Sequence, residues 1–294
     1  MKIAINQLLE TEQQKFTDAL ISCIETFSAP DRLKESVLYS IRAGGKRIRP
    51  ILMKLMCKGL NGDEERIYPA AIALEMVHTY SLIHDDLPAM DDDEFRRGQL
   101  TNHKKFDEAT AILAGDGLLA NSFQLITQAE CYSDREKSYI VSMLAQASGL
   151  EGMVAGQYLD MQAENREISI AELEQIHRLK TGRLISFAIE VGGFLAKASV
   201  VQMQKIKVFG DYVGLIFQIQ DDILDVEGDQ AITGKQIGSD AVNDKSTYTS
   251  LLGLEGAKQH KEQYVSQAME ALRQLELEHS DLARVCQYIS ERNQ

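Results

Sequence analysis

The sequence predicts an all-α protein, a helical bundle that forms one domain over residues 1–294. All four prolines lie in the first 88 residues, so the rest of the chain can form long, unbroken helices. Helix-start patterns recur there, at Ser133-x-x-Glu136, Ser169-x-x-Glu172 and Ser199-x-x-Gln202. No convincing run of alternating apolar and polar residues predicts a strand. One predicted helix instead carries an apolar stripe, formed by Ile206, Phe209, Val213, Ile216 and Ile223.

These patterns also give the positions of the helices. We expect helices at about 5–27, 31–43, 50–60, 70–87, 108–129, 134–155, 171–196, 200–226 and 247–272, with one more near the C-terminus. The least helical long stretch is Gly228–Asp244, which contains three glycines and is expected to form a loop.

The composition narrows the classes of partner. The net charge of −13 argues against nucleic acid, which attracts basic surfaces, and against an anionic membrane surface. No apolar run reaches the ~18 residues that a transmembrane helix requires, and the first residues lack a signal-peptide pattern. The four cysteines form no C-x-x-C pair, which favours buried thiols in a reducing compartment. We therefore expect a soluble, cytoplasmic protein without a membrane anchor.

A dense acidic segment follows the most apolar predicted helix. That helix, residues 70–87, is apolar on every side and should be central, so carboxylates at its end are costly without a partner. Mg²⁺ would resolve the conflict, because it takes one or two carboxylates together with water and phosphate oxygens. Pro88 should end the helix and let Asp91 reach back toward Asp85 and Asp86. A solvated acidic loop is the favoured interpretation for the residues next along the chain, Asp92, Asp93 and Glu94.

A second acidic group repeats the first. Ile219-Gln220-Asp221-Asp222-Ile223 is similar to Ile83-His84-Asp85-Asp86-Leu87, and both stand at the ends of apolar helices. Asp221 and Asp225 are one helical turn apart and share a face with Gln218, so their like charges repel unless cations lie nearby. One such motif is weak evidence, but two favour metal binding and suggest two halves of one Mg²⁺ site that clamps a diphosphate.

Cationic residues complete the pattern. Gly44-Gly45-Lys46-Arg47-Ile48-Arg49-Pro50 places three cations in a turn that begins with glycine, where the backbone can approach a ligand closely. Arg96-Arg97 follows the first acidic group directly, and this adjacency favours phosphate binding over a solvated loop. Lys180-Thr181-Gly182 interrupts a helical pattern and would place an ammonium and a hydroxyl inward, a weak signal alone because most lysines are exposed.

Together these residues resemble the trans-isoprenyl diphosphate synthases, and most closely the bacterial farnesyl-type members. The four residues between Asp86 and Asp91, where the plain motif has two, are typical of that type. The resemblance spans most of the chain and rests on the Gly44–Pro50 turn, Glu75–Asp86, Arg96-Arg97-Gly98, Gly115-Asp116, Gly156-Gln157, Lys180-Thr181 and Phe217-Gln218-x-x-Asp221-Asp222-x-x-Asp225.

The resemblance implies a single helical domain around a deep central cavity, in a chain that forms a homodimer. It implies several Mg²⁺ ions per active site, held by Asp85, Asp91 and Asp221, with support from Asp86, Asp222 and Asp225. These six aspartates, Lys180 and Arg96 form the implied catalytic set. The allylic diphosphate would contact Arg96, Lys180, Thr181, Gln218 and Lys235. Isopentenyl diphosphate would contact Lys46, Arg49, His78 and Arg97. Lys235 lies in the glycine-rich stretch, which suggests a lid that closes on the metal site.

The implied reaction joins isopentenyl diphosphate to dimethylallyl or geranyl diphosphate and releases farnesyl diphosphate and diphosphate. The allylic diphosphate ionises, the double bond of isopentenyl diphosphate attacks the cation, and a proton is lost, while an apolar wall excludes water. Tyr80 would act as the floor for the growing chain, with Ser81 beside it, although core packing is the alternative for a tyrosine. Gly210 and Gly214 would either leave room for the tail or pack helices together.

Other functions remain open at this stage. A geranylgeranyl diphosphate synthase would share these motifs and differ in the length of its product. A non-catalytic subunit of a heteromeric synthase could lose metal-site aspartates, but both acidic groups are complete here. A terpene cyclase would lack a site for a second diphosphate, so Lys46, Arg49 and Arg97 argue against it.

Overall fold

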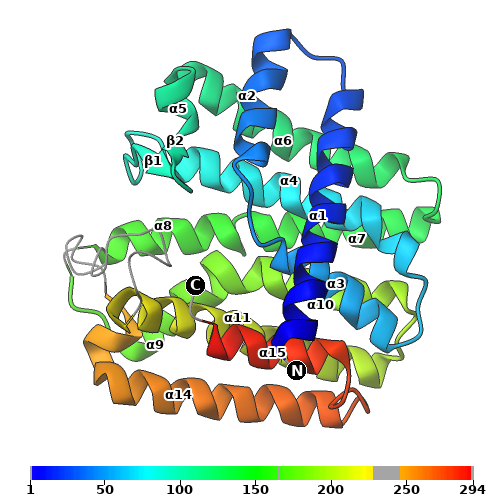
Figure 1. Ribbon diagram of the computed structural model, residues 1–294, viewed down its shortest axis with the longest axis vertical. Helices are drawn as coiled ribbons and strands as arrows, with labels where there is room; N and C mark the ends of the chain where they lie inside the picture. The colour runs from blue at the N-terminus through cyan, green and yellow to red at the C-terminus, as the bar shows by residue number, and fades with distance from the viewer. Residues whose placement is uncertain (1, 165, 228–245, 293–294) are drawn as a thin grey trace. The chain divides into compact units, whose positions relative to one another are not determined.

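The computed structural model describes residues 2–164, 166–227 and 246–292, and most of these residues lie in α-helices (Figure 1). This confirms the predicted all-α class. The chain forms two compact units, residues 1–54 with 64–142 and residues 55–63 with 143–294. We call them unit 1 and unit 2. The single domain over residues 1–294 stays a prediction.

Unit 1 is organised around one buried helix. It contains α1 (Lys2–Thr26), α2 (Asp31–Arg42), the start of α3 (Ile48–Gly59), the 3₁₀ turn η1 (Glu64–Ile67), α4 (Tyr68–Asp85), β1 (Phe95–Arg96), β2 (Gln99–Leu100), α5 (Asn102–Lys105), α6 (Glu108–Gln128) and the start of α7 (Asp134–Ser148). Helix α4 packs against α1, α2 and α6, and every side chain from Ala70 to Val77 is buried. The predicted central helix is therefore confirmed.

A glycine sets the distance between α4 and α6. The Nε2 atom of His84 lies 3.0 Å from the carbonyl oxygen of Ile112, so the ring rests on the backbone of α6. A Cβ atom on Gly115 would collide with that ring. Gly115 thus permits the close contact that holds the end of α4, where the first acidic group begins.

A short hairpin in unit 1 departs from the prediction of helices alone. Strands β1 and β2 are antiparallel, and Phe95 pairs with Leu100 while Arg96 pairs with Gln99. Arg97 and Gly98 form the turn with φ of 54° and 75°, as a tight two-residue hairpin requires. Strands of two residues are too short to show an alternating pattern, which is why the sequence did not reveal them.

Unit 2 surrounds the long helix α11 (Val200–Glu227). Its other elements are the remainders of α3 and α7, α8 (Met153–Ala163), α9 (Ile170–His177), the π-helical turn η2 (Arg178–Gly182), α10 (Arg183–Leu195), α14 (Tyr248–Arg273) and α15 (Asp281–Glu291). Helix α11 contacts α9, η2, α10, α14 and α15 (Figure 1). Its predicted apolar stripe is confirmed, because all five side chains are buried.

Two glycines of α11 allow it to approach α10 and η2 closely. A Cβ on Gly210 would lie 3.2 Å from Cα of Ser186, and one on Gly214 would lie 2.7 Å from Cα of Gly182. Helix packing therefore accounts for both residues, which is the second of the two interpretations given above.

Two predicted helices are interrupted. The helix expected at 134–155 is wrong as a single element, because α7 ends at Ser148 and α8 begins at Met153. Gly149 and Gly152 lie between them, and glycine lowers helix propensity by about 1 kcal/mol relative to alanine. The helix expected at 171–196 changes to π geometry at Arg178–Gly182, and the helix expected at 70–87 ends at Asp85.

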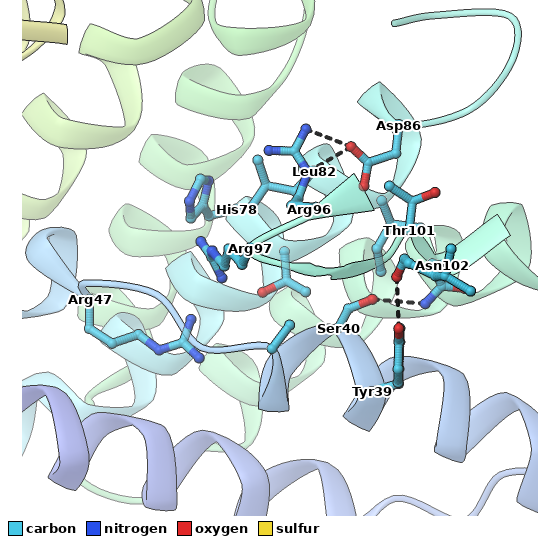
Figure 2. A pocket seen from close by; sticks show the side chains of 14 residues that line it. Tyr39, Ser40, Arg47, His78, Leu82, Asp86, Arg96, Arg97, Thr101 and Asn102 are labelled. Carbon is cyan, nitrogen blue, oxygen red and sulfur yellow. Dashed lines mark hydrogen bonds and ion pairs between the residues drawn. The ribbon is translucent and has the colours of Figure 1, made fainter. Parts of the chain in front are cut away.

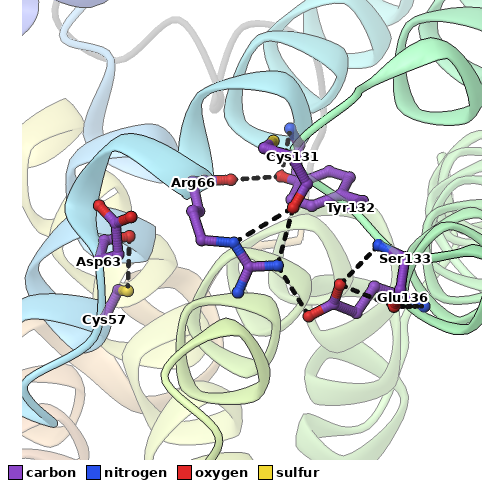
Figure 3. Close-up of polar contacts among 8 residues, drawn as sticks. Cys57, Asp63, Arg66, Cys131, Tyr132, Ser133 and Glu136 are labelled. Carbon is purple, nitrogen blue, oxygen red and sulfur yellow. Dashed lines mark hydrogen bonds and ion pairs between the residues drawn. The ribbon is translucent and has the colours of Figure 1, made fainter.

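The predicted capping boxes form at three helix starts. The Glu136 carboxylate accepts hydrogen bonds of 2.8 Å from the backbone and the hydroxyl of Ser133, and Glu172 accepts the same two from Ser169 at 2.9 Å. At the third start, the backbone N–H of Ser199 donates to the side chain of Gln202, and the backbone N–H of Gln202 donates to the hydroxyl of Ser199. Arg66 donates to the same carboxylate at 2.8 Å and to the Cys131 carbonyl at 2.9 Å (Figure 3). This contact ties η1 to the segment that leads into α7, within unit 1.

The cysteines only partly follow expectation. Cys57 and Cys286 are buried and Cys23 is half-buried, but Cys131 is exposed because it lies in the turn before α7. Within residues 2–164, 166–227 and 246–292, no helix combines the length and apolar character that a membrane crossing requires.

The glycine contacts of α11 give a test of the packing. Gly214→Ala would place a methyl group against the backbone of Gly182, so we expect a loss of about 1–3 kcal/mol in the free energy of unfolding. Gly117→Ala in α6 is the matched control, because a Cβ added at Gly117 would have nothing within 4 Å. That change should stabilise the helix by up to about 1 kcal/mol. Urea unfolding measures both, and equal values for the two variants would contradict the packing.

Candidate active site

The first acidic group forms a turn that folds back on the end of α4. The helix ends at Asp85, and Pro88 lies just beyond it. The backbone N–H of Asp91 donates to the carbonyl of Asp85 at 2.9 Å, and that of Asp92 donates to the carbonyl of Leu87 at 3.1 Å. Asp91 therefore returns to Asp85, as predicted. We call residues 85–93 the first aspartate turn.

Asp86 is an anchor within this turn. Its side chain is buried, and its Oδ1 accepts from Nε of Arg96 at 2.6 Å (Figure 2). Arg96 also reaches Asp93, at 3.4 Å. Burial raises the pKa of Asp86, although the adjacent guanidinium opposes the shift. The ion pair fixes the hairpin against the end of α4, so Arg96 is held by carboxylates of the turn.

Four arginines lie around His78 in unit 1. His78 of α4 is half-buried, and burial together with the charges of Arg49, Arg97, Arg47 and Arg96 holds its pKa well below the usual value. The imidazole is therefore neutral at pH 7. A concentration of like charge beside a neutral ring is a favourable place for an anion.

A small pocket opens among His78, Arg47, Arg96 and Arg97. Figure 2 shows His78 and Arg97 next to each other and Asp86 with Arg96 farther along the pocket. The Arg97 guanidinium donates to the Gly44 carbonyl, and a Cβ on Gly45 would lie 2.9 Å from it. Although Arg97 is exposed as a whole residue, the burial of its guanidinium and the nearby Arg47 lower its pKa to about 10. It stays cationic at neutral pH.

The three cations of the turn at residues 44–50 differ in burial. Arg47 is buried, pairs with Glu75 at 2.9 Å and donates to the Ile41 carbonyl at 3.0 Å. It therefore supports the fold of unit 1. Lys46 is exposed and Arg49 is half-buried, so both differ from Arg47 in being accessible. The sequence spacing alone did not separate these roles.

The two residues predicted to set chain length lie on α4. Tyr80 is buried, and its ring meets that of His84 edge-to-face with centroids 5.3 Å apart. Burial and the charges of Asp85 and Asp116 raise the Tyr80 pKa. Ser81 is half-buried and donates to the carbonyl of His78 at 2.9 Å, so its hydroxyl is engaged by its own helix.

In unit 2, the π-helical turn positions Lys180 and Thr181. Lys180 pairs with Asp160 of α8 at 2.5 Å, and Thr181 donates to the side-chain oxygen of Gln218 at 3.0 Å. A Cβ on Gly156 would collide with the backbone of Lys180, so Gly156 makes room for the turn. The predicted interruption of the helix is confirmed. Asp160 was not predicted, although it lies only four residues after Gly156 and one helical turn along the same helix.

The second acidic group, which we call the second aspartate face, consists of Asp221, Asp222 and Asp225. Asp222 is buried and accepts from the backbone N–H of Tyr248 at 2.8 Å, so it holds the first turn of α14. Asp221 and Asp225 are half-buried, and Asp221 pairs with Arg292 at 2.6 Å. No sequence pattern pointed to Arg292, because it lies 71 residues away.

The aspartates fit Mg²⁺ in unequal ways. Asp86 and Asp222 are buried and already paired, so they suit support more than coordination. The half-buried carboxylates are those of Asp85, Asp91, Asp221 and Asp225. In the part of the chain that the structure describes, no three His, Cys, Asp or Glu side chains converge as a cation cage. The half-buried carboxylates suit Mg²⁺ because its remaining ligands can be water and phosphate oxygens. Lys235 lies outside the described residues.

Known proteins are similar to this chain along most of its length. A family model described as polyprenyl synthetase matches residues 30–289. The farnesyl diphosphate synthase of Micrococcus luteus is 51% identical, with 90% of this chain and 91% of that protein covered. That of Bacillus subtilis is 45% identical and 98% of each chain is covered. The solved structure of an FPP/GFPP synthase from Zymomonas mobilis superimposes with a TM-score of 0.86 at 33% identity, covering 99% of this chain and all of that one. The chain therefore belongs to the polyprenyl synthetase family.

Proposed function

We propose that this protein is a farnesyl diphosphate synthase, which condenses isopentenyl diphosphate with dimethylallyl or geranyl diphosphate. The observation that carries the proposal is the place of Arg97 beside the neutral His78 in the pocket of unit 1, with the charge of Arg49 nearby. Arg47 and Arg96 already pair with Glu75 and Asp86, so Arg97 and Arg49 would bind one diphosphate. The names of the similar proteins from M. luteus and B. subtilis support the fifteen-carbon product.

Isopentenyl diphosphate is assigned to the arginine side of the pocket. Arg97 and Arg49 would bind its phosphates with guanidinium groups, which suit phosphate oxygens, and Lys46 would add an exposed ammonium. A neutral His78 would contribute a hydrogen bond without adding positive charge, which the neighbouring arginines would repel. This second diphosphate site distinguishes the proposal from a terpene cyclase.

The allylic diphosphate is assigned to the aspartates and to the π-helical turn. Asp85, Asp91 and Asp221 would hold Mg²⁺, with Asp86, Asp222 and Asp225 in support. The chemistry that Mg²⁺ supplies when bound is neutralisation of the charge that develops on the departing diphosphate. Lys180, Thr181, Gln218 and Arg96 would contact the same group.

The reaction follows from these placements. The bond between the allylic carbon and oxygen breaks, and the cations around the diphosphate stabilise its new negative charge. The terminal carbon of isopentenyl diphosphate then forms a bond to the allylic cation. The positive charge moves to the methyl-bearing carbon next to the new bond. A proton then leaves the neighbouring CH2 group, whose C–H electrons form the new double bond, with the departing diphosphate as its acceptor. Apolar walls keep water from the cation, which it would otherwise capture.

The remaining parts of the proposal concern the protein as a whole. We assign it one domain over residues 1–294, several Mg²⁺ ions per active site, a homodimeric assembly and a cytoplasmic location. The family resemblance supports the dimer and the metal, and the acidic composition agrees with a protein whose substrates are small molecules.

The metal assignment is tested by product formation from purified protein, isopentenyl diphosphate and geranyl diphosphate. Turnover should require Mg²⁺, and Asp85→Ala or Asp221→Ala should lower kcat by at least about 100-fold, because charge stabilisation on the leaving group is lost. Asp92→Ala is the control, since Asp92 is exposed on the turn. Rates near wild type in either aspartate variant, with the helical circular dichroism intact, would refute the assignment.

The two diphosphate sites should separate kinetically. Lys46→Ala should mainly raise KM for isopentenyl diphosphate, whereas Lys180→Ala should mainly lower kcat/KM for the allylic substrate, each about tenfold or more. Lys105→Ala, at the exposed end of α5, should change neither value. Steady-state titrations of each substrate measure the pattern, and the reverse pattern would exchange the two assignments.

Product length should depend on Tyr80. It lies five residues before Asp85, roughly 7.5 Å along α4 at ~1.5 Å per residue, so we expect its ring to stop the growing tail. Tyr80→Ala should shift the product from fifteen carbons to twenty or more, as chromatography of the dephosphorylated products would show. Tyr158→Ala, on an exposed part of α8, is the control. An active Tyr80→Ala enzyme that still makes only the fifteen-carbon product would remove Tyr80 from this role.

A further inference from the structure

Hydrogen bonds within unit 2 hold the segment after α15 against α11. The side-chain amide of Gln220 donates to the carbonyl of Arg292 at 2.8 Å. Lys261 of α14 donates to the side-chain oxygen of Gln220 and to the carbonyl of Ser290, each at 2.8 Å. The backbone of Arg292 is therefore held at a fixed place beside the second aspartate face.

This placement directs the Arg292 guanidinium to Asp221. Its Nη2 donates to Oδ1 of Asp221 at 2.6 Å and to the Phe217 carbonyl at 3.3 Å, and the group lies 4.1 Å from the centroid of the Phe217 ring. The Arg292 side chain is only 4% exposed, whereas that of Asp221 is 42% exposed. A buried cation thus covers one oxygen of a carboxylate that stays open to solvent on its other side.

The charges of the second aspartate face explain why such a cation is useful. Asp221 and Asp225 repel each other across one helical turn. Asp222 is satisfied by the Tyr248 backbone N–H and contacts the Gln218 amide at 3.4 Å, and both of these donors are neutral. Arg292 supplies a full positive charge to Asp221. It acts as the counter-ion of this face when no metal is bound.

The same contact opposes a metal ion at Asp221. A divalent cation bound to that carboxylate would lie close to the guanidinium, and the two like charges repel. The ion pair uses a single nitrogen and not the two-point fork that makes arginine–carboxylate pairs strongest. The pair is therefore one that an incoming ion can weaken. By linkage, the free energy by which the ion pair stabilises the metal-free protein is subtracted from the free energy of metal binding.

We propose that Arg292 is a positioning residue that competes with Mg²⁺ for Asp221 and so makes metal loading depend on diphosphate. Mg²⁺ alone must approach a face that Arg292 has already neutralised in part. When diphosphate accompanies it, the added negative charge offsets the repulsion between the ion and the guanidinium. The inference rests on the proposed assignment of Asp221 as a Mg²⁺ ligand.

The test is calorimetric titration of the full-length protein with MgCl₂, first alone and then with saturating inorganic diphosphate. Arg292→Gln should bind Mg²⁺ alone roughly five- to tenfold more tightly than wild type, within the usual range of coupling between two sites. With diphosphate present, the difference should fall to about twofold or less. Arg292→Lys keeps the charge and should stay close to wild type. Arg284→Gln is the control, because Arg284 pairs with Asp281 on the exposed side of α15.

A double-mutant cycle separates this inference from the function that it rests on. In an Asp221→Asn background, Arg292→Gln should no longer change the affinity for Mg²⁺. Unchanged or weaker Mg²⁺ binding in Arg292→Gln alone would overturn the competition, while a normal loss of binding in Asp221→Asn would leave the metal assignment standing. If Asp221→Asn binds Mg²⁺ like wild type, the assignment of Asp221 itself fails. If Arg292→Gln does not fold, Arg292→Met removes the charge but keeps an apolar side chain against the Phe217 ring, and it should show the same gain in affinity for Mg²⁺.

Discussion

Burying a carboxylate at the end of an apolar helix is the constraint that organises both acidic groups. Asp86 and Asp222 are each buried, and a buried charge must be paired or hydrogen-bonded. Asp86 pairs with Arg96, which fixes the hairpin in unit 1. Asp222 accepts a hydrogen bond from the backbone N–H of Tyr248, the first residue of α14 in unit 2. The preceding residues, Asp85 and Asp221, are half-buried. Each pair of adjacent aspartates thus joins a buried anchor to a more exposed carboxylate.

The arginines around His78 in unit 1 show how an acidic protein can concentrate positive charge locally. The net charge of −13 sets the field far from the molecule, but within the pocket the nearby groups dominate because charges at short range are screened least. Glu75 neutralises Arg47 at 2.9 Å, so this arginine fills a structural role. Arg49 and Arg97 add their charges beside the neutral His78. Burial, and then this crowding of positive charge, lowers the pKa values of Arg97 and His78.

More of the fold than of the candidate site can be predicted from the sequence. Long helices, capping boxes and the stripe of α11 follow from local periodicity, which adjacent residues determine. The return of Asp91 to Asp85 follows from Pro88, also a local rule. Roles that depend on distant segments do not follow, since nothing near Arg292 indicates that it will meet Asp221. The buried role of Arg47 was hidden for the same reason, because its partner Glu75 lies 28 residues away.

The π-helical turn shows why function can reside where helical geometry is relaxed. A π turn is rare, because its hydrogen bonds are poorer than those of an α-helix, and it is often found at functional sites. Here it is accommodated by two residues without side chains, Gly156 on one side and Gly214 on the other. The extra residue in the turn lets Lys180 reach Asp160 while the next residue, Thr181, reaches Gln218 on α11. Because these close approaches fix the backbone of the turn, the two glycines determine where Lys180 and Thr181 lie, although neither has a side chain to act with.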